Sequence, residues 1–184
     1  GNNCLWQRNF VSNGLNHKAE VKAVTTDPAG NIFAAGIFFN GIRFNDGISN
    51  VFHANTSVDE SDVYLAKFDP QGKYLWSKPF GSSGSQVLKA IKADSQGNVY
   101  ITGMFANTIN FGGVPATNLI SGGQLDIFLA KFDPMGTHLW SKKFGDFSQQ
   151  AGYGVTVDPA DNVIITGPNY STVNCGGVSR AHCA

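Results

Sequence analysis

Acidic side chains recur along this chain at nearly regular spacing, and carboxylates serve both general acid–base catalysis and the binding of hard metal ions. The recurring acids are Asp27, Asp94 and Asp158, then Asp69 and Asp133, then Asp62 and Asp126. The first five precede the Gly or Asn of a tight turn, where an Asp carboxylate accepts backbone amides two residues on. We therefore interpret the repeated aspartates as turn residues. None has the spacing of a calcium loop, and no metal site is expected.

Acids that break the repeat are the ones that an active site would need. They are Asp46, Glu60, Asp146 and Asp161. Their convergence at the centre of a ring would indicate a fragment of a polysaccharide-active enzyme. This is one of three hypotheses for the function, and the other two are non-catalytic.

Histidine and cysteine form no catalytic or metal-binding pattern. The four histidines share no spacing that would place two together, so zinc is not expected. There is no Gly-x-Ser-x-Gly motif and no cysteine with a plausible histidine partner, so we expect neither catalysis nor a cofactor. Of the three cysteines, Cys175 and Cys183 are close enough in sequence to form a disulfide, with two unpaired thiols as the alternative.

The connectors near residues 40, 107 and 170 combine amides with aromatic rings, a mixture that suits sugar hydroxyls and C–H faces. We select Asn40, Asn107 and Tyr170 as candidate ligand-binding residues. Ordinary loop chemistry is the alternative interpretation. If these residues bind sugars, the chain is a carbohydrate-binding protein with one shallow site per repeat.

Charge excludes two classes of partner. The chain has 13 basic and 13 acidic residues, a net charge of zero, and only 14% charged residues. It therefore lacks the basic footprint of a nucleic-acid-binding protein and the polybasic patch of a membrane-surface protein. No apolar stretch is long enough for a transmembrane helix. The missing initiator Met and signal peptide predict a mature product or an excised fragment.

The elements that position these residues come from an internal repeat of about 64 residues. Residues 62–81 and 126–145 are identical at 14 of 20 positions, and Leu5–Phe10 matches their later part. Residues 21–36, 88–103 and 153–167 repeat a second motif. The complete unit predicts four strands, exemplified by Leu88–Ala93, Asn98–Phe105, Asp126–Phe132 and His138–Phe144. They form two hairpins joined by a polar connector, which is a four-stranded antiparallel meander.

Both faces of each predicted sheet are apolar, so both must be covered. In the third strand, Val63 and Leu65 occupy one face, while Tyr64, Ala66 and Phe68 occupy the other. Small residues at Ala23, Ala90 and Gly154 suit a crowded inner edge, and Trp6, Trp76 and Trp140 suit a wider outer edge. Radially repeated four-stranded sheets are the blades of an all-β propeller, whereas a β-solenoid would have shorter rungs.

The motifs Asp-Val-Tyr-Leu-Ala-Lys-Phe-Asp-Pro-x-Gly, Leu-Trp-Ser-Lys-x-Phe-Gly and Asp-x-x-Gly-Asn-x-Tyr-x-Thr-Gly resemble the SBBP-type β-propeller repeat. The resemblance covers essentially the whole chain and implies a binding or scaffold module of a secreted or cell-surface bacterial protein, without catalytic residues. The third copy departs from the motif, because Asp161 replaces the turn glycine, Pro168 follows Thr166-Gly167, and Cys175 replaces an aromatic residue.

The chain is expected to be one domain, residues 1–184, that contains about three blades. The units are a terminal fourth strand in 1–20, blades in 21–81 and 82–145, and a partial blade in 146–184. A propeller usually has four to eight blades, so this ring would be incomplete. We expect a homo-oligomer or the remainder of a longer propeller to cover the ends; an open array is the alternative. The expected ligand is a protein or a glycan.

Overall fold

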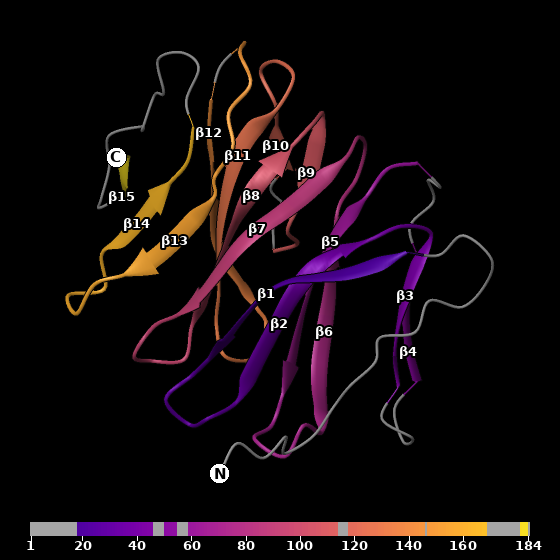
Figure 1. The fold of residues 1–184 in the computed structure, drawn as a ribbon, viewed down its shortest axis with the longest axis vertical. Helices are drawn as coiled ribbons and strands as arrows, with labels where there is room; N and C mark the ends of the chain where they lie inside the picture. Colours follow the sequence, from indigo (N-terminus) through magenta and orange to yellow (C-terminus); the bar gives the residue numbers. More distant parts are fainter. Residues whose placement is uncertain are drawn as a thin grey trace.

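The computed structural model describes residues 18–45, 50–54, 59–113, 118–145, 147–168 and 181–183. Every regular element in these ranges is a β-strand, and the strands form sheets that stand side by side (Figure 1). No helix long and apolar enough to cross a membrane occurs in these ranges. The predicted strand Leu5–Phe10 lies outside the described residues, as do Cys4 and Cys175.

Two four-stranded antiparallel sheets repeat the same strand order. The first has the order β1 (Ala19–Thr26), β2 (Ile32–Phe38), β5 (Asp62–Phe68) and β6 (Tyr74–Phe80). The second consists of β7 (Gln86–Ala93), β8 (Val99–Phe105), β11 (Asp126–Phe132) and β12 (His138–Phe144). The predicted meander is confirmed. The bounds of β11 and β12 match the prediction, whereas β7 begins two residues earlier and β8 one residue later.

The third sheet differs from the other two. It contains β13 (Gly154–Val157), β14 (Val163–Thr166) and β15 (Ala181–Cys183). β13 and β14 form the expected antiparallel pair, but β14 and β15 run parallel. β15 does not carry the third-strand motif seen in β5 and β11, so it is no counterpart of those strands.

The connectors also contain strands, which the sequence analysis did not predict. β3 (Gly41–Asn45) pairs with β4 (Asn50–Ala54), and β9 (Thr108–Asn110) pairs with β10 (Asn118–Ile120). The reason is alternation, since Ile42 and Phe44 lie two residues apart and both are buried. Ile109 and Phe111 repeat this arrangement. Each connector therefore adds apolar side chains to the core.

The two apolar faces of the third strand enter different cores. Val63 and Leu65 pack in a cluster shared by the first and second sheets. Tyr64, Ala66 and Phe68 pack on the opposite side of the first sheet. Both faces of β5 are therefore buried, but on the opposite side the cover comes from Ile42 and Phe44 of the connector strand β3 and not from a neighbouring sheet. A third cluster lies between the second and third sheets.

The strands β1, β7 and β13 lie next to one another and form the inner edge of the assembly (Figure 1). β-bulges interrupt β1 between Val21 and Ala23 and β7 between Leu88 and Ala90. At the β7 bulge the chain passes close to Gly103, where an added Cβ would lie 2.0 Å from the Val87 carbonyl oxygen. Glycine is therefore required in the second strand by backbone contact with the first.

One backbone carbonyl joins the first sheet to the second. The Pro134 oxygen accepts a bond from Lys67 Nζ at 3.1 Å and from Trp76 Nε1 at 3.3 Å. Lys67 also pairs with Asp27 Oδ2 at 3.3 Å within its own sheet. The turn between β11 and β12 is thus held by two side chains of the preceding sheet.

Candidate functional site

The predicted ligand residues Asn40 and Asn107 occupy equivalent turns, before β3 and β9. Their φ angles are 60° and 57°, in the left-handed region that Asn tolerates better than most residues. The Asn107 carbonyl also accepts the Ser121 amide at 2.8 Å. A backbone role therefore accounts for asparagine at both positions. Tyr170 lies outside the described residues, and ligand binding by the three residues stays a prediction.

The aspartates at the turns of the first hairpins close those turns with the same bonds. In Asp27, Oδ1 accepts the amides of Ala29 and Asn31 at 3.0 and 2.9 Å, and Oδ2 accepts Asn31 Nδ2 at 2.8 Å. Asp94 and Asp158 repeat the pattern. Burial acts to raise the pKa of Asp27, but the bonds from Asn31 and the bond and charge of Lys67 together outweigh it and hold the pKa below its usual range. These carboxylates are structural, as predicted.

The acids proposed for an active site are not brought together as a catalytic pair in the described ranges. Glu60 Oε2 accepts the Gly84 amide at 3.2 Å. Asp161 takes a φ of 60°, and its amide donates to the Asp158 carbonyl at 3.0 Å. Asp46 and Asp146 lie outside the described residues. Among the side chains that the structure describes, no three His, Cys, Asp or Glu gather as metal ligands.

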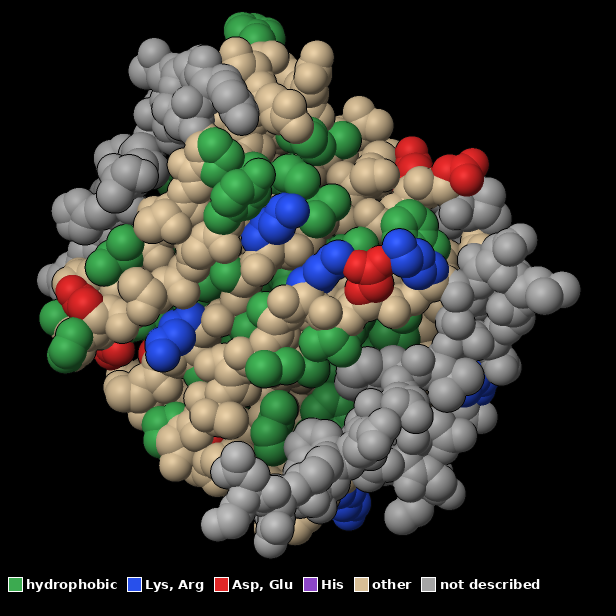
Figure 2. Space-filling view, viewed as in Figure 1, with side chains coloured by type: hydrophobic (Ala, Val, Ile, Leu, Met, Phe, Trp, Pro, Cys, Tyr) green, Lys and Arg blue, Asp and Glu red, His purple; other side chains and the backbone are tan. Residues whose placement is uncertain are grey.

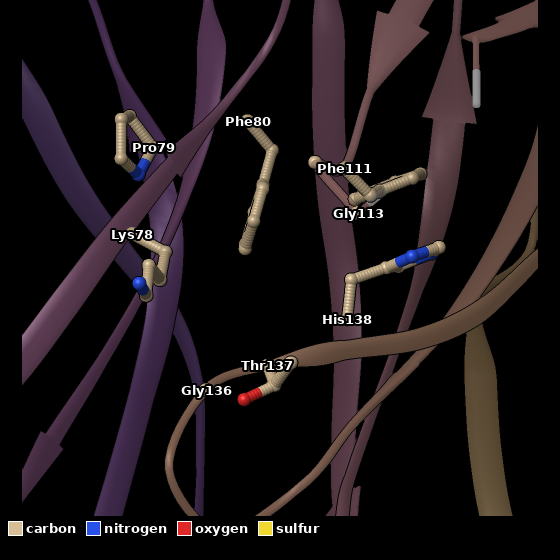
Figure 3. A pocket seen from close by; sticks show the side chains of 9 residues that line it. Lys78, Pro79, Phe80, Phe111, Gly113, Gly136, Thr137 and His138 are labelled. Carbon is tan, nitrogen blue, oxygen red and sulfur yellow. The ribbon is translucent and has the colours of Figure 1, made fainter. Parts of the chain in front are cut away.

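A groove opens between the first and second sheets, with a volume of about 540 Å³ (Figure 3). Three separate segments form its walls: the end of β6, the loop after β9, and the turn that enters β12. Its side chains include Lys78, Pro79, Phe80, Phe111, Thr137 and His138. A cleft of this size accommodates a small ligand or a short stretch of chain.

The groove has an aromatic floor and a positive rim. The His138 ring lies parallel to Phe111, with centroids 6.3 Å apart and an interplanar angle of 7°. Burial lowers the pKa of His138, so the imidazole is neutral at pH 7. Lys78 is exposed, and none of the nine lining residues is acidic. The groove can therefore offer C–H and ring contacts together with one cation.

The sequence analysis missed this groove. Its walls are about thirty residues apart along the chain, and neither Asn40 nor Asn107 lines it. One sequence pattern could have indicated the groove, namely the recurring Ile-x-Phe before glycine. Phe111 and Gly113 of this pattern both belong to the wall. Because the connector was expected to be polar, the sequence analysis did not predict that its aromatic residue would line a groove.

Comparison with known proteins supports the fold and leaves the finer family open. No protein-family model matches the chain. A WD repeat-containing protein of Acanthamoeba polyphaga mimivirus, itself uncharacterised, is 26% identical over 167 residues. The match covers 82% of this chain but only 12% of that relative, so the chain spans about an eighth of the relative's length. WD repeats are propeller blades. The all-β propeller-blade architecture is thus confirmed, and the SBBP type stays a prediction.

Proposed function

We propose that this chain is a non-catalytic binding and scaffold module, and that its first sheet packs against a blade of a second copy. The observation that carries the proposal is an apolar patch on β1, formed by Val21 and Val24. Protein interaction is also the use suggested by the likeness to a WD repeat-containing protein.

The repeat itself indicates what the patch on β1 is built to contact. At an offset of 67 residues, Val21 corresponds to Leu88 and Val24 to Ile91. Leu88 and Ile91 are 0% and 8% exposed, whereas Val21 and Val24 are 46% and 64% exposed. The second-sheet residues are buried because the first sheet covers them, through side chains such as Leu65. A preceding sheet is therefore the natural cover for β1.

A second copy can supply such a sheet. Val163 and Ile165 of β14 face the second sheet, so the alternate residue Ile164 faces away from it. Ile164 corresponds to Tyr100, which the third sheet buries. The outer face of the third sheet in one copy thus matches β1 of the next in a head-to-tail contact. Two copies with three sheets each would give about six blades, within the range in which propellers close.

Molar mass in solution tests the assembly, by light scattering after size-exclusion chromatography at about 100 µM. The expected mass is about twice the 19.6 kDa of one chain. Val24→Glu places a charge in the contact and should return the chain to a monomer. Ile120→Glu is the matched control, because Ile120 is 65% exposed on the connector strand β10 and should leave the mass unchanged. A monomeric parent chain would contradict self-assembly and would leave a blade of a longer chain as the cover.

Carbohydrate binding is a second candidate function, and the groove beside Phe111 supports it. Aromatic edges, the Thr137 hydroxyl and the Lys78 ammonium can together contact a sugar ring and its substituents. Binding to a glycan array should then be lost in Thr137→Trp, which fills the groove. The control is Lys73→Trp, the equivalent position of the first sheet. No binding to any sugar class would contradict this candidate.

A further inference from the structure

The inner strands carry a row of lysine side chains that crosses β1 and β7 (Figure 2). The lysines of these strands and of the residue preceding β1 are Lys18, Lys22, Lys89 and Lys92. The strands β1, β7 and β13 contain one acid, Glu20. A chain whose net charge is zero thus concentrates positive charge along its inner edge. Such a local excess attracts negatively charged partners.

The β-bulges place residues at equivalent positions of the repeat on this inner edge. Lys22 and Lys89 are the extra residues of the β-bulges in β1 and β7, and Tyr153 is the corresponding residue before β13. A bulge turns one side chain out of the ordinary alternation of the strand. Lys89 Nζ lies 5.3 Å from the centre of the Tyr153 ring, so equivalent positions of neighbouring sheets meet. The bulges therefore gather their side chains on one surface.

Half of the row is already paired and half is available. Glu20 forms ion pairs with Lys18 and Lys22, and these two bonds lower the Glu20 pKa to about 2. No carboxylate in the described part of the chain forms an ion pair with Lys89 or Lys92. Lys89 instead contacts Tyr153, which is 55% exposed. On β7, Lys92 is exposed and Lys89 is half-buried against the tyrosine ring.

We infer that the surface formed by Lys89, Lys92 and Tyr153 binds an extended, acidic peptide segment of a partner protein. Carboxylates would pair with the two ammonium groups, and the exposed tyrosine ring would cover the intervening backbone. A nucleic acid is a poorer fit, because tight phosphate binding needs a broader basic footprint than two unpaired lysines. The surface belongs to a single chain, so it does not depend on the proposed self-assembly.

Fluorescence anisotropy with a labelled peptide of about ten residues, alternating Glu and Ala, tests this inference. Lys89→Glu and Lys92→Glu should each weaken binding about three- to tenfold, and the double variant by more than tenfold. Affinity should also fall as salt rises from about 0.05 to 0.5 M, since exposed charges are screened. Lys73→Glu is the control, because Lys73 is an exposed lysine in the turn before β6.

The variants distinguish binding at the lysine row from two other effects, self-assembly and attraction by the overall charge of the chain. Val24→Asn, which disturbs the proposed contact between copies without adding a charge beside the row, should keep the affinity for the peptide, because the lysine row lies within one chain. An equal loss in Lys73→Glu would show attraction by overall charge and would overturn the inference. The inference would also fail if the peptide did not bind, if salt had no effect, or if single-stranded DNA of equal charge bound more tightly than the peptide.

Discussion

Replacing Gly103 with alanine tests whether the inner bulge determines the packing of the first two strands of a blade. The added Cβ would lie 2.0 Å from the Val87 carbonyl oxygen and 3.0 Å from two carbons of the Phe128 ring. An ordinary carbon–oxygen contact is about 3.3 Å. β7 and β8 would therefore have to separate by more than an ångström in a core that includes Phe128 and Leu88. Such overpacking is costly because a buried strand pair has little room to relax.

We expect Gly103→Ala to lower the free energy of unfolding by about 3–5 kcal/mol, near the upper end for single substitutions. For a chain of this size, that corresponds to a fall in Tm of about 10 °C, measured by circular dichroism. Gly112→Ala is the control, since its Cβ would meet nothing within 4 Å. The expected destabilisation by Gly112→Ala comes from placing a side chain at a φ of 78°, and it is about 1–2 kcal/mol. Equal Tm values for the two variants would refute the argument from backbone contact.

Lys67→Met should destabilise the chain by about 3 kcal/mol, because it removes a buried cation that pairs with Asp27 and also binds the next sheet at Pro134. The equivalent Lys131→Met should cost about 1 kcal/mol less, and urea denaturation that ranks them the other way would contradict the inter-sheet link. Burial, and then the charge of Glu60, raise the pKa of Asp62 from 3.8 to about 6, so folding loses stability as the pH rises from about 4 to 6. Asp62→Asn should recover about 1 kcal/mol at pH 8, allowing for partial exposure; an unchanged profile of unfolding free energy against pH would count against this reasoning.

The strands that the sequence predicted best are those bounded by local turn chemistry. β11 and β12 match their predicted bounds because Asp133 and Gly136 determine the turn between them through bonds that join residues two to four positions apart. The two faces of β5 were also predictable, since alternation alone assigns Val63 and Tyr64 to opposite sides. Information within about ten residues was sufficient for these features.

Features that depend on distant contacts were not predictable in the same way. The short strands β9 and β10 form because Ile109 and Phe111 reach a core made by other sheets. The groove requires the end of β6, the loop after β9 and the turn that enters β12 to meet, which no local pattern records. Asn107 was selected for its side chain, but its left-handed backbone is what the structure uses. From the sequence alone, an asparagine that binds a ligand through its side chain looks the same as one that adopts a left-handed backbone conformation.

The link through the Pro134 carbonyl has a consequence for how such proteins can grow. Lys67 and Trp76 bind a backbone oxygen rather than a side chain, so the contact does not depend on the neighbouring residue Met135. A duplicated gene segment would carry both donors in one copy and the acceptor in the next. New units could therefore be joined at once, and their exposed turn residues could diverge afterwards without loosening the joint.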